Sequence, residues 1–228
     1  MLGYYSPNVT YVEVLSNVSR VRQLMPIKCV FFDFDGVLRN WDYEMDGIEE
    51  NYGIPLEAMR EIAFAPENVE PAVRGLVTDE EWRANVGRIL AKRFPDKDAA
   101  GAIRFWDSRI GELVPEVLEI IKECKLKLPV ALFTNATSKL NQDLKALGVA
   151  DLFDHVVNAS EIGSVKPEPE IFAHAVELVG INPNEAFFTD DKPENVEVAK
   201  HLGWSGHPFE HAAGLRSALI TLGVLGSA

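Results

Sequence analysis

The chain has 228 residues, of which 35 are acidic and 22 are basic, so its formal net charge at pH 7 is −13. This length is sufficient for a complete α/β core with one smaller module, whereas the strong negative charge argues against nucleic acid or an anionic membrane as the main partner. No apolar run reaches membrane-spanning length, so a membrane protein is not expected.

The first 24 residues precede the first expected strand. They lack the basic start and the apolar stretch of a secretory signal. Two interpretations stay open for them. Either they extend the chain upstream of a natural start at Met25, or they form an interaction arm through a weak apolar stripe made by Val12, Leu15, Val18 and Leu24.

Two cysteines occur in the sequence, Cys29 in the first expected core strand and Cys124 on an amphipathic helix. Both positions predict buried thiols, so a disulfide framework is not expected. Buried free thiols are typical of a reducing compartment, and we therefore expect the protein to be cytoplasmic.

The first strong strand pattern covers residues 28–34 and ends in two acids, Asp33 and Asp35, before Gly36. An extended chain alternates its faces, so the two carboxylates begin on the same side. The turn at Gly36 lies at the carboxyl end of the strand, where open α/β sheets bind ligands. Like charges so close persist most readily when a cation or a shared proton relieves their repulsion. The pair therefore indicates Mg²⁺ and phosphate chemistry, with a simple polar turn as the alternative.

Between Leu38 and Pro115 the pattern changes from strands to amphipathic helices, which indicates an inserted helical module. Thr78–Glu81 forms a capping box that predicts a helix start, and Trp82, Val86, Ile89 and Leu90 follow on one face of that helix. Arg39, Asn40 and Trp41 directly follow the first motif and are candidates for gating the site. Four further residues could contact an anion or a ring, but we assign them to solvated charges and to the core of the module: Arg74, Arg83, Arg104 and Trp106.

Three later segments also end in polar residues. The apolar run at 128–134 ends at Thr134 and Asn135, and the run at 186–190 ends at Asp190 and Asp191. Between them lies Lys166, in a loop that Pro167 and Pro169 hold extended before a helix. Each has a structural alternative, such as a helix cap or an ordinary exposed lysine, but an ordered set of four motifs favours one shared site.

Strand-like runs near 28–34, 129–134, 153–157, 186–190 and 204–208 alternate with helical periodicity. Such alternation predicts a parallel sheet covered by helices. One helix opens at Pro115, another ends before Gly148, and further helices are expected over 170–179, over 193–202 and at the end of the chain.

The four motifs, in this order, resemble those of the haloacid dehalogenase superfamily, whose members are mostly phosphatases. The resemblance covers residues 28–38 and about 115–222, and residues 187–204 are especially similar to the helical-cap phosphatase branch. It implies an α/β fold with a Rossmann-like doubly wound parallel sheet as the core and an inserted all-helical cap over the active site. The core is expected over 25–40 and 113–228, the cap over 41–112, and an N-terminal extension over 1–24.

The resemblance also implies roles for individual residues. Asp33 is the nucleophile and Asp35 the general acid and base, while Thr134 and Lys166 bind the transferring phosphoryl group and Asn135 binds substrate. Mg²⁺ is the expected cofactor, with Asp191 touching it directly and Asp190 acting through water. The expected metal-binding set is Asp33, Asp35, Asp190 and Asp191. Asn195 stands where many relatives carry another acid, so its role is left open.

These features predict a Mg²⁺-dependent phosphatase that hydrolyses a small soluble phosphomonoester, for example a sugar phosphate, through an aspartyl phosphate. A sugar phosphomutase of the same family is the closest alternative, and a non-catalytic phosphate-binding protein is a further one. A dehalogenase is less expected, because relatives that cleave carbon–halogen bonds do not need the acid at Asp35. No phosphate-binding loop or dinucleotide fingerprint occurs, which argues against ATP or NAD dependence. The sequence does not predict the oligomeric state.

Overall fold

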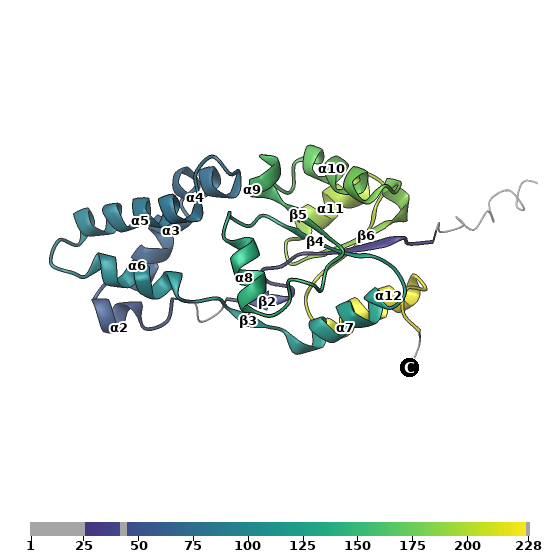
Figure 1. The fold of residues 1–228 in the computed structure, drawn as a ribbon, viewed down its shortest axis with the longest axis horizontal. Coiled ribbons are helices and arrows are strands. Elements are labelled where there is room, and N and C mark those ends of the chain that lie inside the picture. The colour runs from purple at the N-terminus through teal and green to yellow at the C-terminus, as the bar shows by residue number, and fades with distance from the viewer. Residues whose placement is uncertain (1–25, 42–44, 227–228) are drawn as a thin grey trace, which may run out of the picture.

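A parallel sheet forms the centre of the computed structural model, which describes residues 26–41 and 45–226 (Figure 1). Within these residues the sheet has five strands in the order β5-β4-β1-β6-β7, and every neighbouring pair is parallel. The strands are β1 (Cys29–Phe32), β4 (Val130–Thr134), β5 (His155–Asn158), β6 (Ala186–Asp190) and β7 (Ser205–Pro208). The order confirms the predicted doubly wound α/β core. The interpretations of residues 1–24 lie outside the described residues.

The central strand, β1, sets the position of the polar residues that follow the strands. Phe32 pairs with Leu132 on β4 and with Thr189 on β6. Because these three strands are parallel and in register, their carboxyl ends meet at one edge of the sheet. Asp33, Thr134 and Asp190 therefore lie side by side there, although long stretches of sequence separate them.

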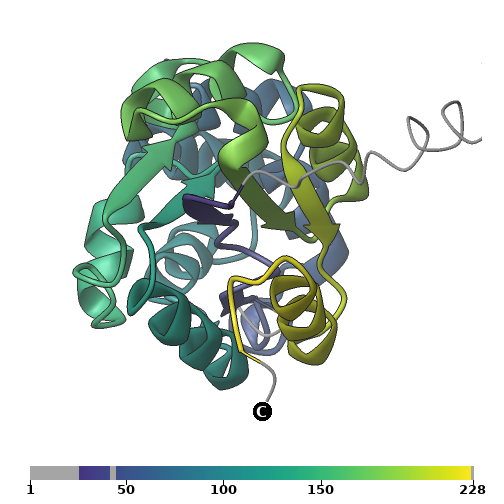
Figure 2. The same ribbon diagram turned by 90° about the vertical axis from the view of Figure 1, so that its right-hand side faces the viewer.

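Helices cover both faces of the sheet, as two views at right angles show (Figure 2). Val30 and Phe32 of β1 pack into a cluster with α7 (Pro115–Lys125), α8 (Leu140–Ala146) and α12 (Ala212–Thr221). Cys29 and Phe31 point the other way, into a cluster with α10 (Pro169–Val179) and α11 (Pro193–His201). The alternation of a fully buried strand thus builds two apolar layers, which fix β1 and its polar ending rigidly.

A second group of helices lies between β2 (Arg39–Asn40) and β3 (Glu112–Leu113), two short antiparallel strands where the chain enters and leaves the group. We call this group, residues 45–107, the helical insertion. It has its own buried apolar cluster, in which Trp82, Val86 and Trp106 take part. The predicted capping box is present, with Thr78 and Glu81 bonded reciprocally. Its helices are α2 (Ile48–Tyr52), α3 (Leu56–Ala63), α4 (Pro66–Val73), α5 (Asp79–Arg93) and α6 (Ala99–Asp107).

Two short elements complete the described fold, α9 (Ala159–Ile162) and a 3₁₀ turn, η1 (Pro183–Glu185). Cys29 and Cys124 are free and fully buried, as predicted, and burial raises the pKa of each thiol to about 12. Among the helices over 26–41 and 45–226, none is both long and apolar enough to span a membrane.

Candidate active site

Three acidic side chains meet at the carboxyl edge of the sheet. Asp33 follows β1, Asp190 ends β6, and Asp191 follows directly. Each offers a carboxylate oxygen, and these oxygens all lie within 4.8 Å of one another. Asp190 is fully buried and Asp33 nearly so, whereas Asp191 is exposed. Three of the four expected metal ligands are thus brought together.

The Lys166 ammonium lies between two of these acids. Its Nζ donates to Asp33 Oδ1 at 2.8 Å, to Asp190 Oδ2 at 2.6 Å and to the Phe133 carbonyl at 2.8 Å. The Lys166 side chain is only 1% exposed, so these pairs are shielded from water. No sequence pattern around Lys166, which lies between Val165 and Pro167, would require such burial, and the buried position therefore indicates a specific role for its charge.

Asn135 holds the loop that carries Lys166. Its side-chain amide donates to the Lys166 carbonyl at 2.9 Å, and its side-chain oxygen accepts from the Lys166 N–H at 2.8 Å. Sequence reasoning expected Asn135 to bind substrate. Both ends of its amide bond to the backbone of Lys166, which supports a positioning role, and because Asn135 also lines the cavity, substrate binding by this residue stays a prediction. Thr134, one residue earlier, is buried at the end of β4 and lines the same cavity as Lys166.

The charges at this edge do not balance. Burial raises the pKa of the Asp33 carboxyl to about 7, an effect that Lys166 opposes and the Asp190 carboxylate reinforces. Burial alone would lower the pKa of the Lys166 ammonium, but Asp33 and Asp190 outweigh it and hold that pKa above the usual range. Burial and Asp190 also raise the pKa of Asp191. One ammonium faces three carboxyl groups, so the site favours a further cation.

Asn195 supports Asp190. Its Nδ2 donates to both carboxylate oxygens of Asp190, each at 3.0 Å, and the Lys192 N–H also donates to Oδ1 at 2.8 Å. With Lys166 on Oδ2, both Asp190 oxygens already accept hydrogen bonds. An amide can donate to Asp190 whereas an acid would repel it, which gives a physical reason for asparagine at this position.

Gly36 lies directly against Asp191. Its φ of +82° is in the left-handed region, and a Cβ built on it would lie 2.5 Å from Asp191 Oδ2. Both the backbone conformation and the space therefore require glycine here. The turn after the first motif is shaped by a residue that comes 155 positions later in the chain.

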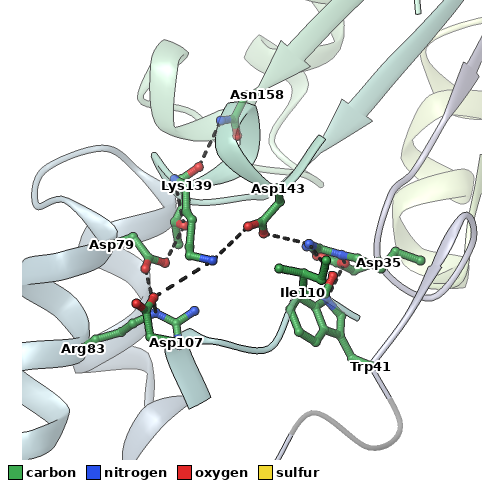
Figure 3. Close-up of polar contacts among 11 residues, drawn as sticks. Asp35, Trp41, Asp79, Arg83, Asp107, Ile110, Lys139, Asp143 and Asn158 are labelled. Atoms are coloured by element: carbon green, nitrogen blue, oxygen red, sulfur yellow. Dashed lines mark hydrogen bonds and ion pairs between the residues drawn. The ribbon is translucent and has the colours of Figure 1, made fainter. Parts of the chain in front are cut away.

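Asp35 does not join the acidic group. Its carboxylate accepts from Arg39 Nε at 2.6 Å and Arg39 Nη2 at 3.1 Å, and from Trp41 Nε1 at 2.6 Å (Figure 3). The Arg39 guanidinium is buried between the rings of Phe34 and Trp41, at 4.1 and 4.2 Å from their centres, and also donates to Asp143 at 2.7 Å. The carboxylate of Asp35 thus lies outside the cluster of Asp33, Asp190 and Asp191, and the expectation that Asp35 belongs to the metal-binding set stays a prediction. Sequence reasoning missed this pairing, although Arg39 follows Asp35 by four residues.

Polar contacts connect the helical insertion to the core beside the site (Figure 3). Asp79 begins α5 and accepts from the Thr137 hydroxyl at 2.7 Å. Asp79 also accepts from Arg83 Nε at 2.6 Å. Farther away, Arg74 donates twice to Glu168, at 2.6 and 3.1 Å. Arg83 is therefore not the solvated charge that the sequence predicted, because it is buried and paired at the start of the helix.

A cavity of about 640 Å³ lies between the core and the helical insertion. This volume is in the range of small-molecule sites. Residues from both parts form its wall. The core contributes Asp33, Asp35, Thr134, Lys166 and Asp191, and the insertion contributes Phe64, Val69, Val73, Trp82, Arg83 and Trp106.

Known proteins with a similar sequence or a similar fold were found for this chain. A family model described as haloacid dehalogenase-like hydrolase matches residues 27–203. A phosphorylated carbohydrates phosphatase of Thermotoga maritima is 26% identical over 185 residues, which cover 78% of this chain and 82% of that protein. The crystal structure of a HAD family enzyme from Bacteroides thetaiotaomicron, a magnesium complex, has a TM-score of 0.67 and 25% identity, and covers 82% of this chain and 94% of that one.

A further relative is much longer than this chain. The protein SUPPRESSOR OF QUENCHING 1, chloroplastic, of Arabidopsis thaliana is 27% identical over 190 residues. The match covers 76% of this chain but 17% of the plant protein.

Proposed function

Because this chain belongs to the family of haloacid dehalogenase-like hydrolases, we propose that it is a Mg²⁺-dependent phosphatase acting on a small soluble phosphomonoester. One observation carries the proposal. The Lys166 ammonium is buried between Asp33 and Asp190 at the carboxyl edge of the sheet, in the wall of a cavity large enough for a metabolite. A relative named as a phosphatase of phosphorylated carbohydrates supports the same class of reaction.

The acidic group has the chemistry that Mg²⁺ requires. Mg²⁺ prefers oxygen ligands, often one or two carboxylates together with phosphate oxygens and water. Asp33 and Asp191 would hold the ion directly, and Asp190, whose oxygens already accept hydrogen bonds, would act through water. When bound, the ion would neutralise excess negative charge and polarise the phosphoryl oxygens.

Asp33 is the proposed nucleophile. A carboxylate oxygen of Asp33 forms a bond to phosphorus while the bond from phosphorus to the leaving oxygen breaks. Water then attacks the same phosphorus, the bond to Asp33 breaks, and inorganic phosphate leaves. The position of Asp33, fixed by the packed strand β1 and by the Phe34 N–H at 2.7 Å from Oδ1, supports this role because a nucleophile must be aimed before reaction.

Lys166 and Thr134 are proposed to bind the phosphoryl group as it transfers. Negative charge spreads over the phosphoryl oxygens in the transition state, and donors that are already oriented stabilise it without reorganisation. Asn135 and Asp190 orient Lys166, from its backbone and from its ammonium respectively. The contacts of Asn135 and Asp190 thus support a Lys166 ammonium that is held in one orientation before the reaction.

Asp35 is proposed as the general acid and base. It would give a proton to the leaving oxygen and later take one from the attacking water, and such catalysis typically contributes about 10²–10⁴-fold. Arg39 and Trp41 hold its carboxylate in the wall of the cavity. The helical insertion is proposed as the cap that excludes water over this group and selects the leaving group.

The compartment is a separate proposal. Cys29 and Cys124 are buried thiols, which are compatible with a reducing environment such as the cytoplasm.

A panel of phosphorylated metabolites with and without Mg²⁺ tests the proposed function. Release of phosphate that requires Mg²⁺ and is abolished in Asp33→Asn is expected. Formation of an isomeric phosphate without release would instead identify a mutase. Absence of any turnover over a broad panel would favour a phosphate-binding protein and would overturn the proposal.

A further inference from the structure

The helical insertion presents aromatic side chains to the cavity. The Phe64 side chain is 46% exposed and lines the cavity together with Trp82 and Trp106. The Phe64 ring centre lies 6.1 Å from that of Trp82 and 6.2 Å from that of Trp106, and the two indoles are 5.0 Å apart in an edge-to-face arrangement. These three rings form one continuous aromatic wall, whose exposed member is Phe64.

Arg83 extends this wall and has a hydrogen-bond donor without a partner. Its guanidinium carbon lies 3.9 Å from the centre of the Trp106 ring, and its Nε donates to Asp79. Its Nη1 is buried and has no hydrogen-bond acceptor among the described residues. A buried donor without an acceptor is costly, and an acceptor atom on a bound molecule would satisfy it.

The aromatic wall and the reacting groups belong to the same cavity. Asp33 and Lys166 line it from the core, and its volume of about 640 Å³ exceeds what a phosphoryl group alone would fill. The alcohol part of a substrate held at Asp33 therefore extends toward the insertion. Hydroxyl groups of a sugar would find no hydrogen-bond partner on the exposed Phe64 ring, whereas a planar ring gains contact with its face.

We propose that the leaving group of the substrate carries a planar heteroaromatic ring, which packs against Phe64 and offers an acceptor atom to Arg83. This inference rests on the proposed phosphatase function and narrows its substrate class from phosphomonoesters in general. From the sequence we expected a substrate such as a sugar phosphate; the substrate proposed here has a heteroaromatic leaving group instead.

The test compares kcat/KM for four phosphomonoesters that differ in the leaving group. Pyridoxine 5′-phosphate has a heteroaromatic ring, benzyl phosphate a ring without an acceptor atom, and glucose 6-phosphate and glycerol 3-phosphate have no planar ring. We expect pyridoxine 5′-phosphate to exceed the last two by about tenfold or more, with benzyl phosphate between. Equal values for pyridoxine and benzyl phosphates, or a preference for glucose 6-phosphate, would overturn the proposal.

A pair of variants tests the wall itself. Phe64→Ala should lower kcat/KM for pyridoxine 5′-phosphate about tenfold and leave glycerol 3-phosphate within about twofold. Leu76→Ala, the matched control, removes an exposed apolar side chain of the insertion outside the cavity and should change neither substrate. An equal loss on all substrates in Phe64→Ala would contradict a ring contact.

Binding separates failure of this inference from failure of the proposed function. Asp33→Asn should bind pyridoxine 5′-phosphate more tightly than glycerol 3-phosphate in calorimetry. Ring-selective binding by a wild-type protein without turnover would refute the phosphatase and retain the ring site. Turnover without any ring preference would refute the ring site and retain the phosphatase.

Discussion

Replacing Lys166 by methionine removes one positive charge from the most deeply buried part of the site and keeps a side chain of similar length. In the wild type the ammonium donates to Asp33 at 2.8 Å and to Asp190 at 2.6 Å with 1% of the side chain exposed. Lys166→Met leaves these two carboxylates buried together without their shared partner. Both stability and catalysis should therefore suffer.

The two magnitudes follow from different effects. Removing one partner of a buried ion pair costs about 3–5 kcal/mol of folding free energy, because the remaining charge stays buried and unpaired. Removing one preoriented donor from a transition state costs about 10²–10³-fold in kcat. Mg²⁺ should recover part of the stability, since it binds the folded carboxylates, but it should not recover the rate. The different responses of stability and rate to Mg²⁺ distinguish the loss of charge balance from the loss of transition-state stabilisation.

Urea unfolding with and without Mg²⁺ gives the stability, and phosphate release under saturating Mg²⁺ gives kcat. Lys200→Met is the matched control, because Lys200 pairs with Glu197 on the exposed surface at 2.8 Å and should change neither quantity. A Lys166→Met protein with more than about a tenth of the wild-type kcat, or with unchanged stability, would show that this buried charge does not have the proposed role.

Three further predictions follow from the same geometry. Gly36→Ala places a Cβ 2.5 Å from Asp191 Oδ2, so the Mg²⁺ concentration for half-maximal activity should rise about 10–100-fold; an unchanged Mg²⁺ titration would contradict the close approach. Arg39→Met removes the two hydrogen bonds that hold the Asp35 carboxylate. The kcat should therefore fall about 10²-fold for alkyl phosphates but much less for 4-nitrophenyl phosphate, whose leaving group needs no proton. Equal losses of kcat for both kinds of substrate would indicate that Arg39 has only a structural role. Burial raises the pKa of Asp33 to about 7, so this carboxyl is protonated below that pH and must lose its proton to bind metal. Calorimetry should therefore show weaker Mg²⁺ binding at pH 6 than at pH 8. Equal affinities at the two pH values would argue against Asp33 as a ligand.

The sheet and the positions at its carboxyl edge followed from local patterns. Apolar runs such as 129–134 and 186–190 alternate with helical periodicity, and parallel strands necessarily share a carboxyl edge. Asp33 and Asp190 were therefore expected to meet without knowledge of any long-range contact. The helix starts at Pro115 and after Thr78 were also predictable, because caps and first-turn prolines act locally.

The parts that were not predicted depend on partners far apart in the sequence. Arg39 pairs with Asp143 across 104 positions, and no local pattern indicates that pairing. Asn135 bonds through both ends of its amide to the backbone of Lys166, 31 positions later, and no local pattern indicates these two bonds. Arg83 was assigned to solvent because charged helical residues are usually exposed, yet the core covers its helix start. The antiparallel pairing at Arg39–Asn40 also escaped prediction, because strands of two residues carry no periodic signal.

Identification of the residue that carries the phosphoryl group during turnover would test the proposed aspartyl-phosphate mechanism itself. Rapid quenching during a single turnover with Mg²⁺, followed by borohydride reduction, converts an aspartyl phosphate into homoserine that peptide mass spectrometry can locate. We expect homoserine at position 33 alone, and only when Mg²⁺ is present. Homoserine at another acidic position, or turnover with Asp33 unmodified throughout, would contradict the assignment of Asp33 as the nucleophile.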